Sequence, residues 1–192
     1  MVLVDGFRLD LVYSVPAEQQ GSWVSLTTDH LGRLIVSDQE GQLYRISLGA
    51  QASSTEVERL PVKIGCAHGL LYAYDSLYVT VNASRQATEK TGYQSGLYRL
   101  FDRDRDDQFD EIILLRKLRG MSEHGPHGLQ LGPDGRIYLI SGNNEKIGDG
   151  ISERSPFRNW ADDLLVPSKG NGLLPAGWVM RTDEAGETWE LV

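Results

Sequence analysis

The chain is poor in cysteine and has no long apolar run. Cys66 is the single cysteine among 192 residues, so no intrachain disulfide can form and no CxxC metal or haem motif is present. No apolar stretch approaches the about 20 residues that a membrane-spanning helix needs, and residues 1–10 lack the basic region and apolar core of a signal peptide. The sequence as printed therefore predicts neither a membrane span nor a leader, and Cys66 is expected to be a small buried hydrophobe.

Clusters of lysine and arginine are also absent. The formal charge is −8, and a surface of that sign repels phosphates, which argues against a nucleic-acid binder. The 40% of apolar and 24% of charged residues are typical of a globular protein. Aromatic and β-branched residues recur in short runs separated by Gly, Asp, Asn and Pro, a pattern that favours strands and turns. We therefore expect an all-β fold.

The sequence does contain a repeat. Three similar segments each read as two short strands around a polar turn, and they lie at 23–37, 68–80 and 127–141. A second shared element follows each segment, with an arginine at the same place, and a fourth strand completes each unit. Four antiparallel strands per unit are typical of β-propeller blades. A β-sandwich is the alternative, but sandwiches do not repeat one strand sequence in this way.

The repeat predicts a partial ring. Three four-stranded blades are expected, at about 23–64, 67–120 and 126–192, within a single partial β-propeller. Residues 7–15 alternate as a strand before the first blade, which fits an outer strand that closes a missing last blade. Three blades cannot close a ring, because propellers have about four to eight. By itself the chain should form an open arc that exposes apolar blade faces, self-associates and is catalytically silent.

Histidines and one long loop gather on one predicted face. The links that enter the first strand of a blade share a face with the links between its second and third strands. This places His68, His124 and His127 beside loops 83–94 and 143–176, whereas His30 falls on the opposite face. The second loop is far longer than a blade hairpin needs and is expected to bind a ligand. Its candidate binding groups include Asn143, Asn144, Lys146 and Arg158.

An acidic segment is expected in the hairpin between the third and fourth strands of the second blade. Its alternating carboxylates, with a backbone carbonyl from Gln108, resemble the oxygen-rich shell that Ca²⁺ prefers. The predicted calcium ligands are Asp102, Asp104, Asp106, Gln108 and Asp110. Asp107 stands where such loops favour glycine, and Ile113 stands where many carry a bidentate Glu. The alternative is a solvated acidic turn that Arg103 and Arg105 partly neutralise.

The histidine segment at 123–143 carries a resemblance to a known superfamily. It resembles the propeller of the glucose/sorbosone dehydrogenase-like proteins. Together with residues 32–39 and 101–110, it is more closely similar to the membrane-bound dehydrogenase domain found beside haem-binding CxxCH modules in planctomycete-type bacteria. The resemblance covers nearly the whole chain. The chain lacks one feature of the superfamily pattern, an arginine near the position of Gly128.

The resemblance implies a quinone-dependent oxidation of a sugar or alcohol. His124 matches the superfamily's base, which takes the substrate hydroxyl proton while hydride moves to pyrroloquinoline quinone (PQQ). Glu123 could raise the basicity of that imidazole. His127 is the second catalytic candidate, and His68 with the cationic groups of the long loop would hold the cofactor's carboxylates. The resemblance further implies a periplasmic or exported parent protein whose electrons pass to a cytochrome c-type module.

Other interpretations of the same residues stay open. Alternatively, the chain belongs to a non-catalytic propeller that binds a glycan or a protein partner on the histidine face. His124 and His127 would then only shape a Gly-Pro turn, because a function inherited from fold analogy is an associational argument. A metal bound between these two histidines is a further option, although no third ligand is visible in the sequence.

Overall fold

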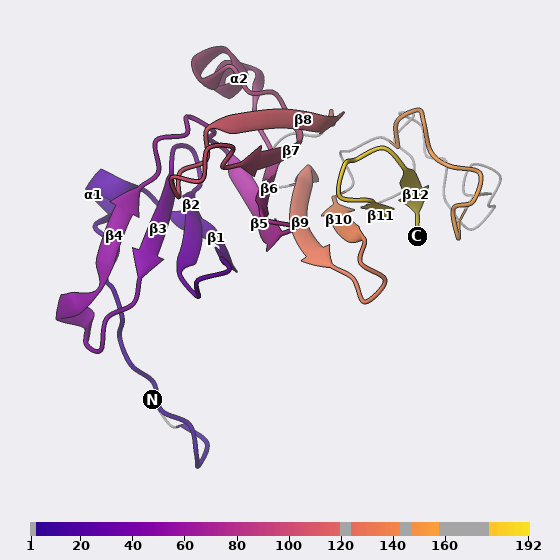
Figure 1. Ribbon diagram of the computed structural model, residues 1–192. Coiled ribbons are helices and arrows are strands. Elements are labelled where there is room, and N and C mark those ends of the chain that lie inside the picture. Colours follow the sequence, from indigo (N-terminus) through magenta and orange to yellow (C-terminus); the bar gives the residue numbers. More distant parts are fainter. Residues whose placement is uncertain (1–2, 120–123, 143–146, 158–176) are drawn as a thin grey trace.

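The protein folds into three antiparallel sheets. The computed structural model describes residues 3–119, 124–142, 147–157 and 177–192. Each sheet has four strands that pair in chain order, and the sheets follow one another along an arc (Figure 1). This arrangement confirms the predicted all-β fold and is that of a partial β-propeller.

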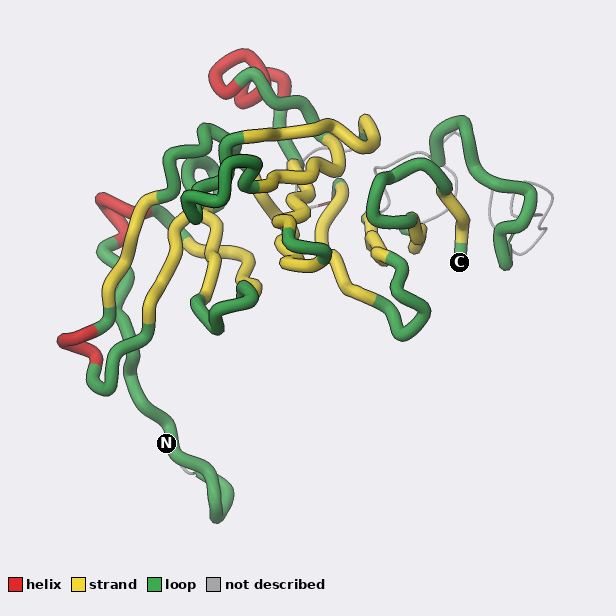
Figure 2. The backbone as a smooth tube through the Cα atoms, in the orientation of Figure 1, coloured by secondary structure: helices red, strands yellow, loops and turns green. Residues whose placement is uncertain are grey.

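The strands account for most of the regular structure (Figure 2). The first sheet contains β1 (Trp23–Thr28), β2 (Leu34–Asp38), β3 (Leu43–Ser47) and β4 (Glu56–Arg59). The second contains β5 (Ala67–Ala73), β6 (Ser76–Val81), β7 (Gly96–Phe101) and β8 (Glu111–Lys117). The third contains β9 (Pro126–Leu131), β10 (Ile137–Ser141), β11 (Trp178–Thr182) and β12 (Trp189–Leu191).

The helical segments that the structure describes are short and lie in connections. They are α1 (Ala17–Gln20), α2 (Arg85–Thr91) and one 3-10 turn (Ala52–Ser54). In α2 the Ser84 hydroxyl accepts a hydrogen bond from the Ala87 amide, which caps the first turn. Among the described residues, no helix has the length and apolar character that a membrane crossing requires.

Apolar side chains hold successive sheets face to face. Ile35 and Leu43 of the first sheet are fully buried in one cluster with Val79 of the second. Leu139 of the third sheet is fully buried in another cluster with Tyr78 of the second. Because adjacent residues of a strand point to opposite faces, Tyr78 and Val79 supply one side chain to each interface. The second sheet is therefore buried on both faces.

The inner strands β1, β5 and β9 of the three sheets lie next to one another. The Ser37 hydroxyl of the first sheet donates a hydrogen bond of 2.6 Å to the Ala67 carbonyl of β5. On the other side of β5, a Cβ added at Gly69 would lie 2.0 Å from the His127 carbonyl oxygen of β9. Glycine is therefore required at this position for the second and third sheets to approach each other so closely.

The expected strand at residues 7–15 is not formed. These residues run as a loop away from the sheets (Figure 2), and Phe7, Leu9 and Leu11 are exposed. Tyr13 alone among their aromatic side chains is anchored, because its ring stacks on Trp23 with 5.5 Å between centroids. A strand forms only where its backbone groups find a neighbouring strand. The role of this segment in closing a last blade stays a prediction.

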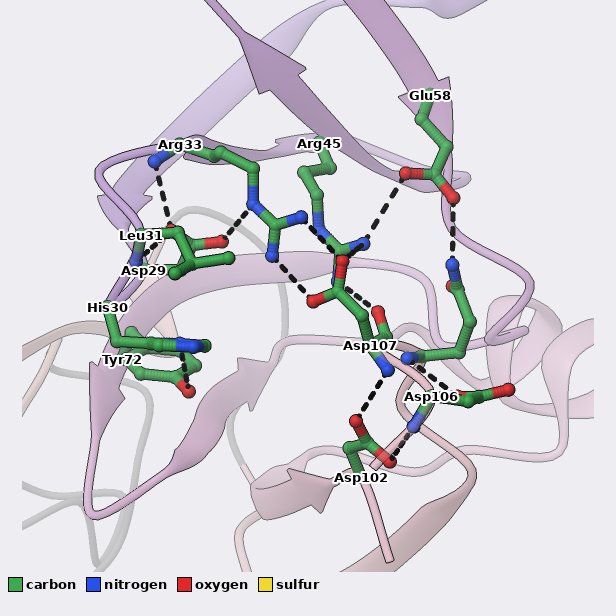
Figure 3. A network of polar contacts seen from close by, with 11 residues as sticks. Asp29, His30, Leu31, Arg33, Arg45, Glu58, Tyr72, Asp102, Asp106 and Asp107 are labelled. Atoms are coloured by element: carbon green, nitrogen blue, oxygen red, sulfur yellow. Dashed lines mark hydrogen bonds and ion pairs between the residues drawn. The ribbon is translucent and has the colours of Figure 1, made fainter. Parts of the chain in front are cut away.

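The acidic hairpin of the second sheet docks onto the first sheet (Figure 3). Both carboxylate oxygens of Asp107 bind the Arg33 guanidinium, at 2.5 and 2.6 Å, and Arg45 donates to the Asp107 carbonyl at 2.8 Å. Arg33 thereby lowers the pKa of the Asp107 carboxyl, although desolvation works in the opposite direction. Glu58 of β4 faces Arg45 at 3.4 Å, so the arginine joins the two sheets with its charge balanced.

We predict that Arg45→Gln lowers the free energy of unfolding by about 2 kcal/mol, because the Asp107 carbonyl loses its donor and the Glu58 and Asp107 carboxylates each lose one cationic partner. The Arg45 side chain is only 4% exposed, whereas Arg103, which pairs with Glu111, is 69% exposed. The control variant Arg103→Gln should change stability by less than about 0.5 kcal/mol. Urea unfolding measures both values, and equal losses would contradict the assigned role of Arg45.

Candidate functional site

A cleft of about 650 Å³ opens where β5 and β9 begin. His68 from β5 and His127 from β9 both line it. The two imidazole rings lie side by side, with 5.6 Å between their centroids and an angle of 45° between their planes. Residues 59 positions apart in the sequence thus form one pair, because the inner strands of neighbouring sheets are adjacent.

Local backbone features place His68 in this cleft. The pairing of β5 with β6 shifts its register between Ala67 and Gly69, so His68 lies at an irregularity of the strand. Gly69 next to it permits the close approach of His127, as described above. The two histidines are thereby held by inner strands and not by a free loop, which restricts the positions of both rings.

The helix α2 contributes a second side of the cleft. Gln86 and Lys90 of this helix line it, and Asn82 comes from the end of β6 that leads to the helix. Gln39 and Glu40, from the turn after β2, add further polar groups. The described lining therefore offers amide groups that donate and accept hydrogen bonds, together with one cation and one carboxylate.

Cys66 lies in the same cleft in a strained backbone conformation. Its φ is +52°, which non-glycine residues adopt rarely, and its side chain is buried, as expected from the sequence. Burial raises the pKa of the thiol, and the nearby acidic residues Glu40 and Asp38 raise it further. A thiol that stays protonated is a poor nucleophile, so the cleft chemistry rests on the histidines.

The electrostatics of the pair favour a neutral His68. Burial lowers the pKa of His68 below the ordinary value of 6.5, and the neighbouring His127 lowers it further. Desolvation disfavours the charged imidazole, and a second imidazole nearby adds repulsion whenever it is protonated. A neutral imidazole has a free nitrogen lone pair, so His68 can accept a proton at neutral pH.

The structure treats the predicted site residues differently. His68 and His127 come together in the cleft, whereas His124 is exposed and is not among the residues that line it. The backbone of His124 packs against Gly142, where an added Cβ would lie 2.5 Å from the His124 carbonyl oxygen. Four predicted cofactor-binding residues lie outside the described part of the chain: Asn143, Asn144, Lys146 and Arg158. Glu123 also lies outside it.

Sequence reasoning missed the helix α2 and the turn at Gln39. A signal for the helix was present, since Ser84 precedes a run of helix-favouring residues as an N-cap would. No comparable signal marks Gln39 or Glu40, because they reach the cleft only when the first sheet packs against the second.

A quinone with several carboxylates is not matched by the described lining alone. Lys90 is the one cationic side chain among the described residues that line the cleft, and Glu40 offsets its charge. Carboxylates of a ligand are held best by charge-assisted hydrogen bonds, above all from arginine. The amides and imidazoles of the described lining instead suit the hydroxyl groups of a neutral ligand.

The acidic hairpin brings three of its predicted calcium ligands together. Carboxylate oxygens of Asp102, Asp104 and Asp106 all lie within 4.8 Å of one another. Repulsion by Asp106 is the largest cause that raises the pKa of Asp104. Asp110 is not in this group, and its carboxylate accepts a hydrogen bond from the Arg103 amide.

Asp107 stands at the position where calcium loops favour glycine. Asp107 adopts φ of +71° there, and its carboxylate turns away to Arg33 of the first sheet. Gln108, whose carbonyl was a predicted ligand, donates its side-chain amide to Glu58 at 2.9 Å. The Arg103 guanidinium pairs with Glu111, which is not one of the three clustered carboxylates.

The fold is that of a partial propeller, and the cleft opens on one of its faces. No protein-family model matches the chain, and no curated protein matches it. A solved structure similar to it is the PQQ-bound form of an aldose sugar dehydrogenase from Streptomyces coelicolor, with 15% sequence identity and a TM-score of 0.51. The match covers 86% of this chain and 45% of that one, so this chain aligns with less than half of that protein. At this identity the likeness establishes the fold.

We predict that His68 titrates below 6.5 and that its pKa rises in the variant His127→Asn, without reaching the ordinary value, because burial is the larger cause. Protonation of His68 should favour the unfolded chain, so its contribution to stability is lost as the pH falls through the ordinary histidine range. Titration by NMR measures the shift. His30→Asn, on the opposite face, is the control and should leave His68 unchanged; a His68 pKa at or above 6.5 would refute the assignment.

Proposed function

We propose that this chain is part of a quinoprotein-like propeller that oxidises a sugar or an alcohol at the His68–His127 cleft. The observation that carries the proposal is the pair of imidazoles in one cleft, with 5.6 Å between ring centroids and a lowered pKa for His68. Oxidation of an alcohol carbon removes the hydroxyl proton together with a hydride. A neutral imidazole beside the hydroxyl group is suited to accept that proton.

The remaining residues of the cleft would orient the substrate. Asn82, Gln39 and Gln86 offer amide oxygens and NH₂ groups at its wall, which match the alternating donors and acceptors of a sugar. Lys90 and Glu40 could bind further hydroxyl groups. An open cleft of about 650 Å³ has room for a small sugar.

The hydride acceptor in this proposal is PQQ. The similarity to a PQQ-bound aldose sugar dehydrogenase supports the choice at the level of fold. Its carboxylates need cations beyond Lys90, and Lys146 and Arg158 remain the predicted ones. We further propose, from the sequence resemblance, that the parent protein is periplasmic or otherwise exported and passes electrons to a cytochrome c-type module.

A second candidate is a non-catalytic propeller that binds a glycan. The described lining favours it in one respect, since amides and imidazoles suffice to bind hydroxyl groups, whereas cations for a quinone are few. The two candidates differ in whether the histidines are needed for turnover or only for binding.

We predict that His127→Asn and His68→Asn each lower sugar or alcohol oxidation by the complete propeller by about a hundredfold or more, as loss of a general base does. The sequence resemblance favours His124 over His127, whereas His127 lines the cleft and His124 does not. Dye reduction with added PQQ, assayed on the three single variants, decides between these two histidines. His30→Asn serves as the control.

The outcome separates the two candidates. If His124→Asn loses more oxidation activity than the other two variants, the cleft pair is rejected as the proton acceptor. If cofactor-free protein is active without added PQQ, PQQ is rejected as the cofactor. Glycan binding that is weakened in His127→Asn, in a propeller without oxidase or dehydrogenase activity under any condition, would favour the second candidate.

We also propose that the hairpin cluster binds one Ca²⁺ in a structural role. Three carboxylates held within 4.8 Å repel one another, and a hard cation with oxygen ligands removes that repulsion. The hairpin also contacts the first sheet through Asp107, so its order bears on the packing of the two sheets.

For this site we expect saturable heat when Ca²⁺ is added to the metal-free protein in a calorimeter, and a higher melting temperature with the ion. The double variant Asp104→Asn/Asp106→Asn should lose both effects, while Asp75→Asn, an exposed carboxylate in another turn, should keep them. Absence of both heat and thermal stabilisation in the unsubstituted protein would reject the calcium site.

A further inference from the structure

An arginine occupies the same place on the third strand of each sheet. These residues are Arg45 on β3, Arg99 on β7 and Arg181 on β11. In the first two sheets the arginine reaches into the next sheet. Arg45 donates to the Asp107 carbonyl at 2.8 Å, and Arg99 donates to the Glu184 carbonyl at 3.5 Å. Both acceptors lie in the hairpin between the third and fourth strands of the following sheet.

The first sheet accepts a carboxylate because it presents two arginines. Arg33, immediately before β2, binds both oxygens of Asp107, and Arg45 lies 3.3 Å from one of them (Figure 3). Acidic residues of the same sheet support the arginines, since Asp29 accepts from Arg33 at 2.7 Å and Glu58 faces Arg45. Two cations around one carboxylate form a strong, directional contact.

The second sheet presents one arginine and accepts a neutral group. No arginine precedes β6, where Tyr74 and Asp75 form the turn. The hairpin that docks on this sheet accordingly offers a backbone carbonyl, that of Glu184, to Arg99 and to the Tyr78 hydroxyl, which donates at 2.8 Å. What each sheet presents therefore matches what the following hairpin brings.

The third sheet repeats the arrangement of the first. Arg136 stands immediately before β10, as Arg33 does before β2, and Arg181 is paired across the strands with Glu190, as Arg45 is with Glu58. The Arg181 Nε lies 2.7 Å from Glu190, and its Nη1 lies 3.1 Å from Asp134. Within the described residues, these partners of Arg136 and Arg181 all belong to the third sheet itself.

No hairpin of the described residues docks on this face of the third sheet, and the face is more open than its counterpart on the first sheet. The Arg181 side chain is 23% exposed, against 4% for Arg45. One nitrogen of Arg136 is buried but has no hydrogen-bond partner among the described residues, and lies 3.4 Å from Glu190. Ile140, on the same face as Arg181, is 52% exposed, whereas Ile35 and Leu43 on the equivalent face of the first sheet are fully buried.

We propose that Arg136 and Arg181 form a docking site for an acidic β-hairpin of a further propeller blade, which presents an aspartate carboxylate as Asp107 does to Arg33 and Arg45. The two arginines, the greater exposure of Arg181 than of Arg45 and the exposed apolar residue of this face all fit this occupant. A hairpin that offers only a carbonyl, like the one at Glu184, matches the one-arginine face of the second sheet instead.

The test uses the chain's own acidic hairpin as the ligand. A peptide of residues 101–111, cyclised through a cysteine added at each end, is first shown by NMR to form a hairpin. The equivalent site on the first sheet is already filled by the chain's own hairpin at a high effective concentration, so the peptide should meet an open site only on the third sheet. Calorimetry at low salt should give saturable binding to the whole chain.

Matched variants make the result specific. A peptide with Asp107→Asn should bind at least about tenfold more weakly, and so should the unaltered peptide to the chain variant Arg136→Gln/Arg181→Gln. Arg154→Gln, an exposed arginine elsewhere in the third blade, should bind the peptide as the unsubstituted chain does. The Asn peptide leaves the protein untouched, so this comparison holds even where the double variant folds poorly. A folded peptide that does not bind, or that binds equally with Asn, overturns the proposal.

Discussion

The burial of each sheet against the next is the constraint on which the other features depend. A single four-stranded sheet has two faces, and among the described residues only the second sheet has a neighbouring sheet on both, with Val79 packed toward the first sheet and Tyr78 toward the third. This packing brings the inner strands together. Gly69 then allows β9 to come so close that His127 lies beside His68, although the two residues belong to different sheets. The candidate site is thus a direct product of apolar packing between blades.

Polar contacts add selectivity to this packing. Apolar faces attract one another without strong directional preference, whereas an arginine pair accepts a carboxylate only in a defined place. Asp107 enters between Arg33 and Arg45, and the neutral carbonyl of Glu184 reaches Arg99. The first sheet presents two arginines and the second presents one, so each face fits a different hairpin. This difference favours one position of the second sheet on the first. They also give the acidic hairpin a role in the fold that does not depend on a bound ion.

The cleft lies on the face where the inner strands β5 and β9 begin. Starts of inner strands and the connections between second and third strands meet there, so rigid strands supply the histidines while α2 supplies adaptable polar groups. Burial keeps His68 neutral at ordinary pH, and an uncharged imidazole can take a proton from a hydroxyl group. In the proposed function the described lining, which has few cations, would bind a neutral substrate through α2 and the inner strands, and a carboxylate-bearing cofactor would need further residues.

The sequence by itself determined the repeat and the all-β architecture, and it predicted one face for His68, His124 and His127, of which only His68 and His127 line the cleft. Alternating apolar residues and the recurring arginine are local patterns, and they predict the strands of each blade. The same alternation at residues 7–15 forms no strand, because no neighbouring strand pairs with that segment. It also indicated the clustered carboxylates at Asp102, Asp104 and Asp106, because they lie within a few residues of one another. Only the tertiary structure decided that His127 and not His124 shares the cleft with His68, that α2 and Glu40 line it, and that Asp107 binds Arg33. These contacts join residues far apart in the chain, and their geometry is set by how one sheet packs on the next.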